Sequence, residues 1–407
     1  MAFDVERIRS HFPALAEGLA HFDGPGGSQT PDVVGAAVAG TLTAAISNKG
    51  VVTASERRAS AVVADCRQAM ADLLGADPRG IVFGRSATAL TYDLSRALAK
   101  QWGPGDEVVV TRLDHDSNIR PWVQAAETAG ATVRWADFDP ATGELTVADI
   151  EAVLSERTRL VATTAASNLI GTRPPTRHIS DAVHAVGALH WVDGVHATAH
   201  ASVDLRALGA DVWTCSPYKF LGPHCGVLAA DPALLETLHP DKLLPSADTV
   251  PERFELGTLP YELMAGATAA VDFLAGMEDL DTPVTPAGRR ERLETSFAAL
   301  EAHEESLLSV LEPALRAMPG VTVHSNAAHR TPTLLFTVEG VDGMDVYRGL
   351  AEHGVNAPAS SFYALECSRH LGLGDGGGVR VGLAPYTNRG DVDRLLAGVA
   401  DVIGRRG

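Results

Sequence analysis

Lys219 is the residue whose surroundings most directly predict chemistry. The only lysines in the sequence are Lys49, Lys100, Lys219 and Lys242, and Lys219 stands in the segment 211–228, which is mostly apolar, aromatic or glycine. Burying an ammonium group is costly unless the group is paired or used. A desolvated lysine loses its proton more easily and becomes a nucleophilic amine, suited to Schiff-base chemistry. The alternative is an ordinary lysine whose head group reaches water along an apolar stem.

Polar residues follow three strand-like runs upstream of this lysine. His115, Asn168 and Asp193 each come after a run of apolar and β-branched residues, which is typical of buried parallel strands. In open α/β sheets the ligand site lies beyond the carboxyl ends of the strands. The sequence therefore predicts an α/β fold whose site gathers these side chains. Taken alone, an Asp before a Gly is as often a helix cap or turn residue, and most histidines are ordinary polar side chains.

The order of these segments resembles the fold-type I pyridoxal-phosphate (PLP) enzymes and, within them, the class V aminotransferase and cysteine desulfurase group. The resemblance covers almost the whole chain and depends on the motifs at 113–122, 167–172, 193–196, 216–219, 253–258 and 380–388. It implies PLP as cofactor and a large domain with a mainly parallel, seven-stranded type of sheet flanked by helices. It also implies a smaller C-terminal α/β domain.

The resemblance assigns roles to the polar residues. Lys219 would carry the internal aldimine and move protons at the substrate α-carbon, and His115 would stack on the cofactor ring; these two are the candidate catalytic residues. Asp193 would face the pyridine nitrogen, where a carboxylate keeps the nitrogen protonated so that the ring acts as an electron sink. Asn168 and His196 would hydrogen-bond the phenolic oxygen of the cofactor.

A helix N-terminus is the expected phosphate site. A strand near 81–83, a turn at Gly84 and a helical apolar pattern place Ser86, Ala87 and Thr88 at the start of a helix. Backbone N–H groups there bind anions with help from the helix dipole, although Ser86 and Thr88 also fit plain helix caps. Two further hydroxyl groups, those of Ser216 and Tyr218, would add hydrogen bonds. Tyr218 is a departure, since many relatives carry histidine there.

Gly257 and Thr258 would complete the phosphate site of a neighbouring subunit. In related enzymes the matching segment reaches a phosphate in the neighbouring subunit. The resemblance therefore implies a homodimer with shared active sites.

Arg380 is the candidate for binding the substrate carboxylate. It lies in the alternating, strand-like run 378–383 and matches the substrate-binding arginine of the family. A planar guanidinium grips a carboxylate with two parallel hydrogen bonds; the alternative is an exposed arginine on an edge strand. We therefore expect an α-amino acid as substrate. The other residues expected to line its site are Gly26, Gly27, Asn118 and Tyr363.

The cysteines do not match those of cysteine desulfurases. Those enzymes carry a nucleophilic cysteine on a loop of the C-terminal domain, and Tyr363 or a neighbour stands in its place here. Cys367 follows four residues later in a predicted short helix, and a free cysteine is usually inert and buried. The resemblance nevertheless implies a cysteine desulfurase-like enzyme, a carbon–sulfur or related β-lyase. The alternatives are an aminotransferase, an epimerase similar to isopenicillin N epimerase, or a cofactor-binding protein that has lost catalysis.

Composition narrows the function classes. The chain has 407 residues, of which 45% are hydrophobic and 21% charged, as in a globular protein with more than one domain. A net charge of -18 argues against nucleic acid or an anionic membrane as partner. The 4 cysteines lack the paired spacing of disulfides or zinc sites, so we expect no metal and a reducing cytoplasm. No apolar run is long enough to span a membrane.

The elements that position these residues can be placed along the chain. Residues 1–30 form an N-terminal arm that joins the small domain, 31–260 the large PLP-binding domain, and 261–407 the linking helices and small C-terminal domain. Strand and helix patterns alternate between 80 and 230, which indicates a mainly parallel sheet. The clearest helices are predicted at 55–74, 261–280, 287–318, 344–353 and 389–403.

Overall fold

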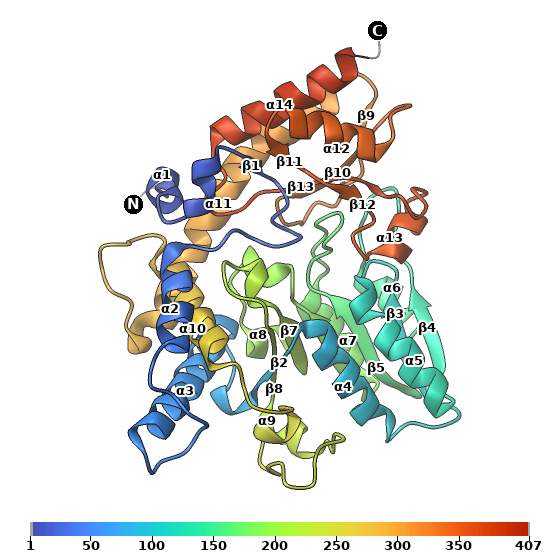
Figure 1. The fold of residues 1–407 in the computed structure, drawn as a ribbon. Helices are drawn as coiled ribbons and strands as arrows, with labels where there is room; N and C mark the ends of the chain where they lie inside the picture. Colours follow the sequence, from blue (N-terminus) through green and yellow to red (C-terminus); the bar gives the residue numbers. More distant parts are fainter. Residues whose placement is uncertain (1–2, 406–407) are drawn as a thin grey trace.

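A seven-stranded sheet lies at the centre of the computed structural model, which describes residues 3–405 (Figure 1). Its strand order is β2–β8–β7–β6–β5–β3–β4. The strands are β2 (Ile81–Gly84), β3 (Glu107–Thr111), β4 (Thr132–Ala136), β5 (Thr158–Thr164), β6 (Leu189–Asp193), β7 (Val212–Cys215) and β8 (Gly226–Ala230). Strands β3 to β7 run parallel, and β8 is antiparallel to both of its neighbours. The predicted mainly parallel sheet is confirmed.

Helices cover both faces of this sheet because its strands are apolar on both sides. In β3, Val108 and Val110 pack into a cluster with helices α4 (Ala87–Ala99) and α5 (Arg120–Ala129). Val109, between them, points to the opposite face and packs near α7 (Thr176–Ala185). Farther along that second face lie α3 (Ala54–Leu74) and α10 (Tyr261–Gly276). Burial on both faces is the rule for parallel sheets.

The C-terminal part has a sheet of its own. Its strand order is β12–β13–β10–β9, and all its pairings are antiparallel. The strands are β9 (Val321–Val323), β10 (Thr333–Val338), β12 (Ala359–Ser360) and β13 (Gly378–Gly382). Helices α12 (Gly343–Glu352) and α14 (Arg389–Gly404) pack on it, and the long α11 (Arg289–Ala317) leads into it. The N-terminal strand β1 (Ala20–His21) pairs in parallel with β11 (Val355–Asn356), so the blue arm lies beside the red elements in Figure 1.

Short helices complete the fold. They are α1 (Val5–Arg9), α2 (Asp32–Leu42), α6 (Val147–Glu151), α8 (Leu205–Leu208), α9 (Pro232–Glu236) and α13 (Leu365–His370). The two long helices predicted at 261–280 and 287–318 are present but shorter. The former ends at Gly276, and the latter begins at Arg289. Within residues 3–405 no helix has the length and apolar character needed to cross a bilayer. The division into domains at residues 30 and 260 stays a prediction.

Candidate active site

Lys219 follows strand β7 in a short turn, Pro217–Lys219, and is largely buried. Its ammonium group donates a hydrogen bond to the Pro25 carbonyl, and within residues 3–405 it forms no ion pair with a carboxylate. Burial and then the charge of Arg380 lower the pKa of Lys219 to about 7, against the opposing effect of Asp193. At neutral pH a large share of this amine is therefore unprotonated and nucleophilic.

Two adjoining cavities meet at Lys219. The larger one, of about 500 Å³, is lined by residues that include Gly26, His115, Asn168, Tyr218, Tyr363 and Arg380. The smaller one, of about 80 Å³, is lined by residues that include Ser86, Ala87, Thr88, Asp193, His196 and Ser216. The residues that line both cavities are Thr88, His115, Ser117, Asn168, Tyr218 and Lys219. The fold thus brings most of the predicted site residues together.

The N-terminus of helix α4 closes one end of the smaller cavity. Ser86 Oγ accepts a hydrogen bond from Ala89 N at 3.1 Å and caps the helix. Strand β8 approaches this turn closely, since a Cβ on Gly226 would lie 2.2 Å from the Ser86 carbonyl carbon. The free N–H groups of this helix end, together with the hydroxyl of Thr88, form a site suited to an anion.

Asp193 ends strand β6 at another side of the smaller cavity. Its Oδ1 accepts a hydrogen bond from Val195 N at 2.9 Å. Burial raises the pKa of Asp193 to about 6, although the hydrogen bond and Lys219 oppose this. A buried carboxylate of this kind is stabilised by a cationic or N–H donor partner.

Two histidines line the smaller cavity in neutral form. His115 Nδ1 accepts from Ser117 N at 3.1 Å, and burial, followed by the charges of Lys219 and Arg380, lowers the pKa of His115 to about 3. Burial also lowers the pKa of His196, whose Nε2 lies 2.9 Å from Thr331 Oγ1. The same Nε2 lies 3.0 Å from Thr333 Oγ1 on strand β10, so His196 connects the central sheet to the C-terminal sheet at the site.

Arg380 on strand β13 points into the larger cavity and is only 2% exposed. Its Nη1 donates to the backbone oxygen of Asn168 at 2.8 Å, and its Nε is buried with no partner among the described residues. Burial lowers the pKa of Arg380 to about 9. A buried cation that forms no ion pair with a carboxylate among residues 3–405 is a strong candidate for binding an anionic ligand.

A tight turn beside Arg380 forms another wall of the larger cavity. Phe362 and Tyr363 both have positive φ values, 52° and 59°. Ala364 N donates to Ser361 O at 2.9 Å, which closes the turn. Two neighbours hold it: Asn168 Nδ2 donates to Phe362 O at 3.0 Å, and Asp116 N donates to Tyr363 O at 2.7 Å. Helix α13, which carries Cys367 as predicted, begins at Leu365, directly after this turn.

Two predicted substrate residues lie behind the cavity wall. Asn118 is buried, its Nδ2 donates to Asp114 Oδ1 at 2.7 Å, and its Oδ1 accepts from Trp122 Nε1 at 3.3 Å. Burial raises the pKa of Asp114 to about 8, and the hydrogen bonds from Asn118 and Thr111 oppose this shift. Gly27 packs against the ring of Tyr218 instead of facing the cavity. Asn118 and Gly27 are not among the described residues that line the two cavities, and their contact with substrate stays a prediction.

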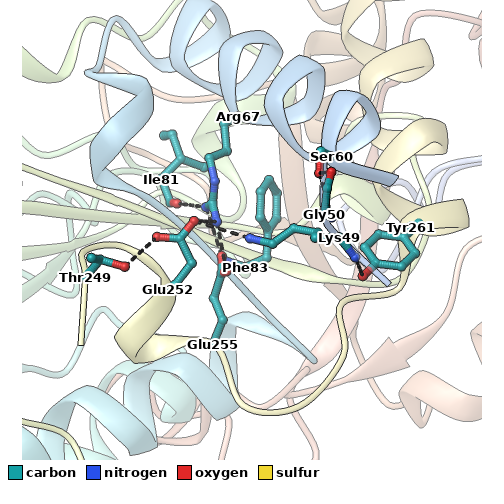
Figure 2. Close-up of polar contacts among 10 residues, drawn as sticks. All are labelled: Lys49, Gly50, Ser60, Arg67, Ile81, Phe83, Thr249, Glu252, Glu255 and Tyr261. Carbon is teal, nitrogen blue, oxygen red and sulfur yellow. Dashed lines mark hydrogen bonds and ion pairs between the residues drawn. The ribbon is translucent and has the colours of Figure 1, made fainter. Parts of the chain in front are cut away.

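Gly257 and Thr258 lie outside both cavities of their own chain, within the part that the structure describes. The preceding segment is fixed by a buried ion pair, in which Arg67 Nη2 lies 2.8 Å from Glu255 Oε2 (Figure 2). Glu255 Oε1 also accepts from Phe83 N at 3.1 Å. Thr258 lines a separate cavity of about 740 Å³.

The four cysteines are free and buried. Burial raises the pKa of the Cys367 thiol on helix α13 far above its usual range. Of the residues that the structure describes, no cysteine lines either cavity at Lys219. A buried, protonated thiol is a poor nucleophile.

Sequence reasoning did not single out four polar residues that line the larger cavity. These are Tyr92, Asp116, Ser117 and Arg120. Tyr92 lies on helix α4, and Arg120 is the first residue of α5. Asp116 and Arg120 are spaced one helical turn apart and follow directly after His115. This spacing could have indicated that both lie near the site.

Comparison with known proteins agrees with this geometry. A family model described as Aminotransferase class-V matches residues 20–395. The uncharacterized protein MT3887 of Mycobacterium tuberculosis is 36% identical over 408 residues, which cover 99% of this chain and 100% of that protein. A cysteine desulfurase of Pectobacterium carotovorum subsp. carotovorum is 30% identical over 421 residues, with 98% of each chain covered. The crystal structure of the Escherichia coli cysteine desulfurase CsdA, in its S-sulfonic acid form, matches with a TM-score of 0.86, 25% identity and 100% coverage of both chains.

Proposed function

The chain belongs to the class V aminotransferase family, and on that premise we propose that it is a PLP-dependent enzyme acting on an α-amino acid. Members of this family depend on PLP. The observation that supports the proposal most is the convergence of Lys219, Asp193, Arg380 and the N-terminus of helix α4 on two adjoining cavities. These residues come from distant parts of the chain, and each would have a different role in binding the cofactor or the substrate.

The residues of the smaller cavity fit PLP. Ser86, Ala87, Thr88 and Ser216 offer N–H and hydroxyl donors for the phosphate. Asp193 is a buried carboxylate suited to a ring N–H. Asn168 Oδ1 is buried and has no hydrogen-bond partner among the described residues, which leaves it free for a polar group of the cofactor.

Each side chain would then contribute one function. PLP, when bound, supplies an electron sink for negative charge at the substrate α-carbon. Lys219 would hold the cofactor and then accept and return the α-proton, because an amine with a pKa of about 7 exchanges protons readily at neutral pH. Asp193 would stabilise a protonated ring nitrogen, and neutral His115 would cover the ring face. Arg380 would orient the substrate through its carboxylate.

For the reaction we propose a carbon–sulfur or related β-lyase. The cysteine desulfurases among the relatives support this choice. Because Cys367 is buried and protonated, the leaving group would depart into solvent without first bonding to a thiol of this chain. The same observation favours a second candidate, an aminotransferase or an amino-acid epimerase, since neither reaction needs a thiol.

We also propose that the enzyme works as a homodimer. Gly257 and Thr258 lie away from Lys219 in their own chain, and the neighbouring Leu256 is exposed. The buried Arg67–Glu255 pair would hold this segment ready to reach the phosphate of a second copy. Sedimentation of the PLP-loaded protein tests this, because a monomer that binds PLP tightly would contradict shared sites.

Product analysis with a panel of amino acids tests the reaction. Purified protein loaded with PLP is mixed with L-cysteine and other amino acids, and three outcomes are separated. Release of sulfide, alanine or pyruvate supports a lyase. Pyridoxamine phosphate supports an aminotransferase, and solvent deuterium at Cα without net conversion supports an epimerase. Lys219→Ala should abolish every reaction, whereas the exposed Lys100→Ala serves as the matched control.

A further inference from the structure

A pair of opposite charges, outside the residues assigned above, lies in the wall of the larger cavity. Arg120 Nη2 is 2.9 Å from Asp116 Oδ1, and both residues line the cavity together with Lys219 and Arg380. The side chains are 36% and 32% exposed. Both charges are therefore accessible to a ligand in that cavity.

Neighbouring groups hold the pair in place. Asp116 N donates to the Tyr363 carbonyl at 2.7 Å, which ties the pair to the tight turn beside Arg380. Glu366 Oε1 lies 4.0 Å from Arg120 Nη2, and Glu366 is itself bound by Arg112 at 2.8 Å. A pair held in this way loses little conformational freedom when a ligand binds.

Helix stability does not account for Arg120. It is the first residue of helix α5, where the helix dipole disfavours a positive charge. A partly exposed ion pair between residues four apart contributes little to stability. A residue type that is unfavourable at its position in a helix, and that adds little stability through other contacts, indicates a functional role.

The position and charge of the pair indicate what it would bind. Arg380 and Lys219 are assigned to the α-carboxylate and the α-carbon, so Asp116 and Arg120 remain for the side chain of the substrate. A cavity of about 500 Å³ is roomy enough for an extended side chain. A guanidinium binds carboxylates and a carboxylate binds ammonium groups, so adjacent opposite charges match both charges of an amino-acid head group.

On the basis of the proposed function, we infer that Asp116 and Arg120 form a subsite for a second, distal amino-acid head group of the substrate. Arg120 binds the distal carboxylate, and Asp116 binds the distal ammonium group. The substrate class is a diamino dicarboxylic acid, in which two amino acids are joined through their side chains by a thioether, a disulfide or a carbon chain.

Ligand titration tests this subsite without relying on turnover. Three ligands of equal chain length and without a carbon–sulfur bond are compared: L,L-diaminosuberate, L-aminosuberate and L-aminooctanoate. They end in a zwitterion, a carboxylate alone and a methyl group. Binding to PLP-loaded protein is followed by the cofactor absorbance for wild type, Arg120→Gln and Asp116→Asn. The control is Arg177→Gln, which breaks an exposed ion pair with Asp181 of the same spacing on helix α7.

We expect wild type to bind diaminosuberate about tenfold more tightly than aminooctanoate, the size of one charge-assisted hydrogen bond. Arg120→Gln and Asp116→Asn should each remove most of that preference. Aminosuberate should lose affinity only in Arg120→Gln, and Arg177→Gln should match wild type.

Equal affinity of wild type for all three ligands, or an unchanged preference in Arg120→Gln, would overturn the subsite while leaving the proposed function intact. Failure of wild type to bind PLP is a different outcome, since it would overturn the proposed function and the subsite together.

Discussion

The guanidinium of Arg380 lies 3.7 Å from the centroid of the Phe362 ring. Asn168 connects the two residues, because its backbone oxygen accepts from Arg380 and its side chain donates to the Phe362 carbonyl. The ring thus covers one side of a buried cation and fixes the direction in which its free N–H groups point. A ligand carboxylate would meet donors that are already oriented.

Replacing Phe362 with Leu should weaken amino-acid binding. A cation–π contact contributes roughly 1 kcal/mol, and more when the cation is desolvated, so the affinity for L-aminooctanoate should fall at least about fivefold. Titration of PLP-loaded protein measures the effect. The affinity for PLP itself should not change, because Phe362 does not line the smaller cavity. An unchanged affinity for the amino acid would show that the ring does not orient Arg380.

Tyr363→Gly should stabilise the protein despite the loss of a large side chain. Tyr363 is 76% exposed and has a φ of 59°, a conformation that costs a non-glycine residue about 1 kcal/mol. Urea denaturation should show a gain of up to about 1 kcal/mol. Ser361→Gly, at a turn position without positive φ, is the control and should destabilise. A loss in Tyr363→Gly equal to that of the control would contradict strain at Tyr363.

Glu255→Gln should destabilise the protein strongly. Arg67 and Glu255 are both buried and hydrogen-bonded to each other, and without the Glu255 charge Arg67 keeps only its longer carboxylate contact, with Glu252 at 3.4 Å. The cost should therefore approach about 3–5 kcal/mol, that of breaking a buried ion pair. Asp181→Asn, in an exposed pair with Arg177, should cost less than about 1 kcal/mol. Chemical denaturation of both variants provides the comparison. Equal effects would show that the Glu255 charge does not fix its segment.

The stability of the cofactor-free protein should depend on pH through Lys219. Its pKa falls from 10.5 to about 7 on folding, so between these values the unfolded chain binds a proton that the folded chain lacks. Stability therefore rises with pH across this window, and the full penalty is present below pH 7. Lys219→Met should be more stable than wild type at pH 7, by on the order of 3 kcal/mol, and the difference should shrink towards pH 10. A constant difference across this range would contradict the lowered pKa.

Cys367→Ala should retain turnover. The thiol is fully buried and protonated, so it is not available as a nucleophile. Activity on the substrate found in the amino-acid panel should stay within about twofold, with a small loss of stability from the cavity left by the sulfur. A loss of activity in a variant that folds normally would make Cys367 a candidate catalytic residue.

The residues at strand ends were predictable because one physical rule places them. Asp193 ends β6, Lys219 follows β7, and parallel strands bring such positions to one edge of the sheet. The same rule placed Asn168 and His115 at the site. Arg380 was predictable from the alternating pattern of its strand together with the family resemblance.

The direction of a side chain was not predictable where a distant partner determines it. Asn118 turns away from the cavity because buried Asp114 needs its amide as a donor, and nothing in the local sequence shows that Asp114 is buried. The positive φ values of Phe362 and Tyr363 were also not predictable from the local sequence. Tertiary contacts impose this conformation on residues that do not prefer it. The role of Asp116 and Arg120 depends on a cavity that only the folded chain forms.

Covalent trapping of the cofactor tests the central proposal most directly. PLP-loaded protein is reduced with borohydride and digested, and the peptides are analysed by mass spectrometry. With only Lys49, Lys100, Lys219 and Lys242 in the chain, each possible attachment site can be distinguished. We predict that the cofactor mass appears on the peptide that contains Lys219 and is absent in Lys219→Ala. Label on another lysine, or no label although PLP is bound, would contradict the assignment of Lys219.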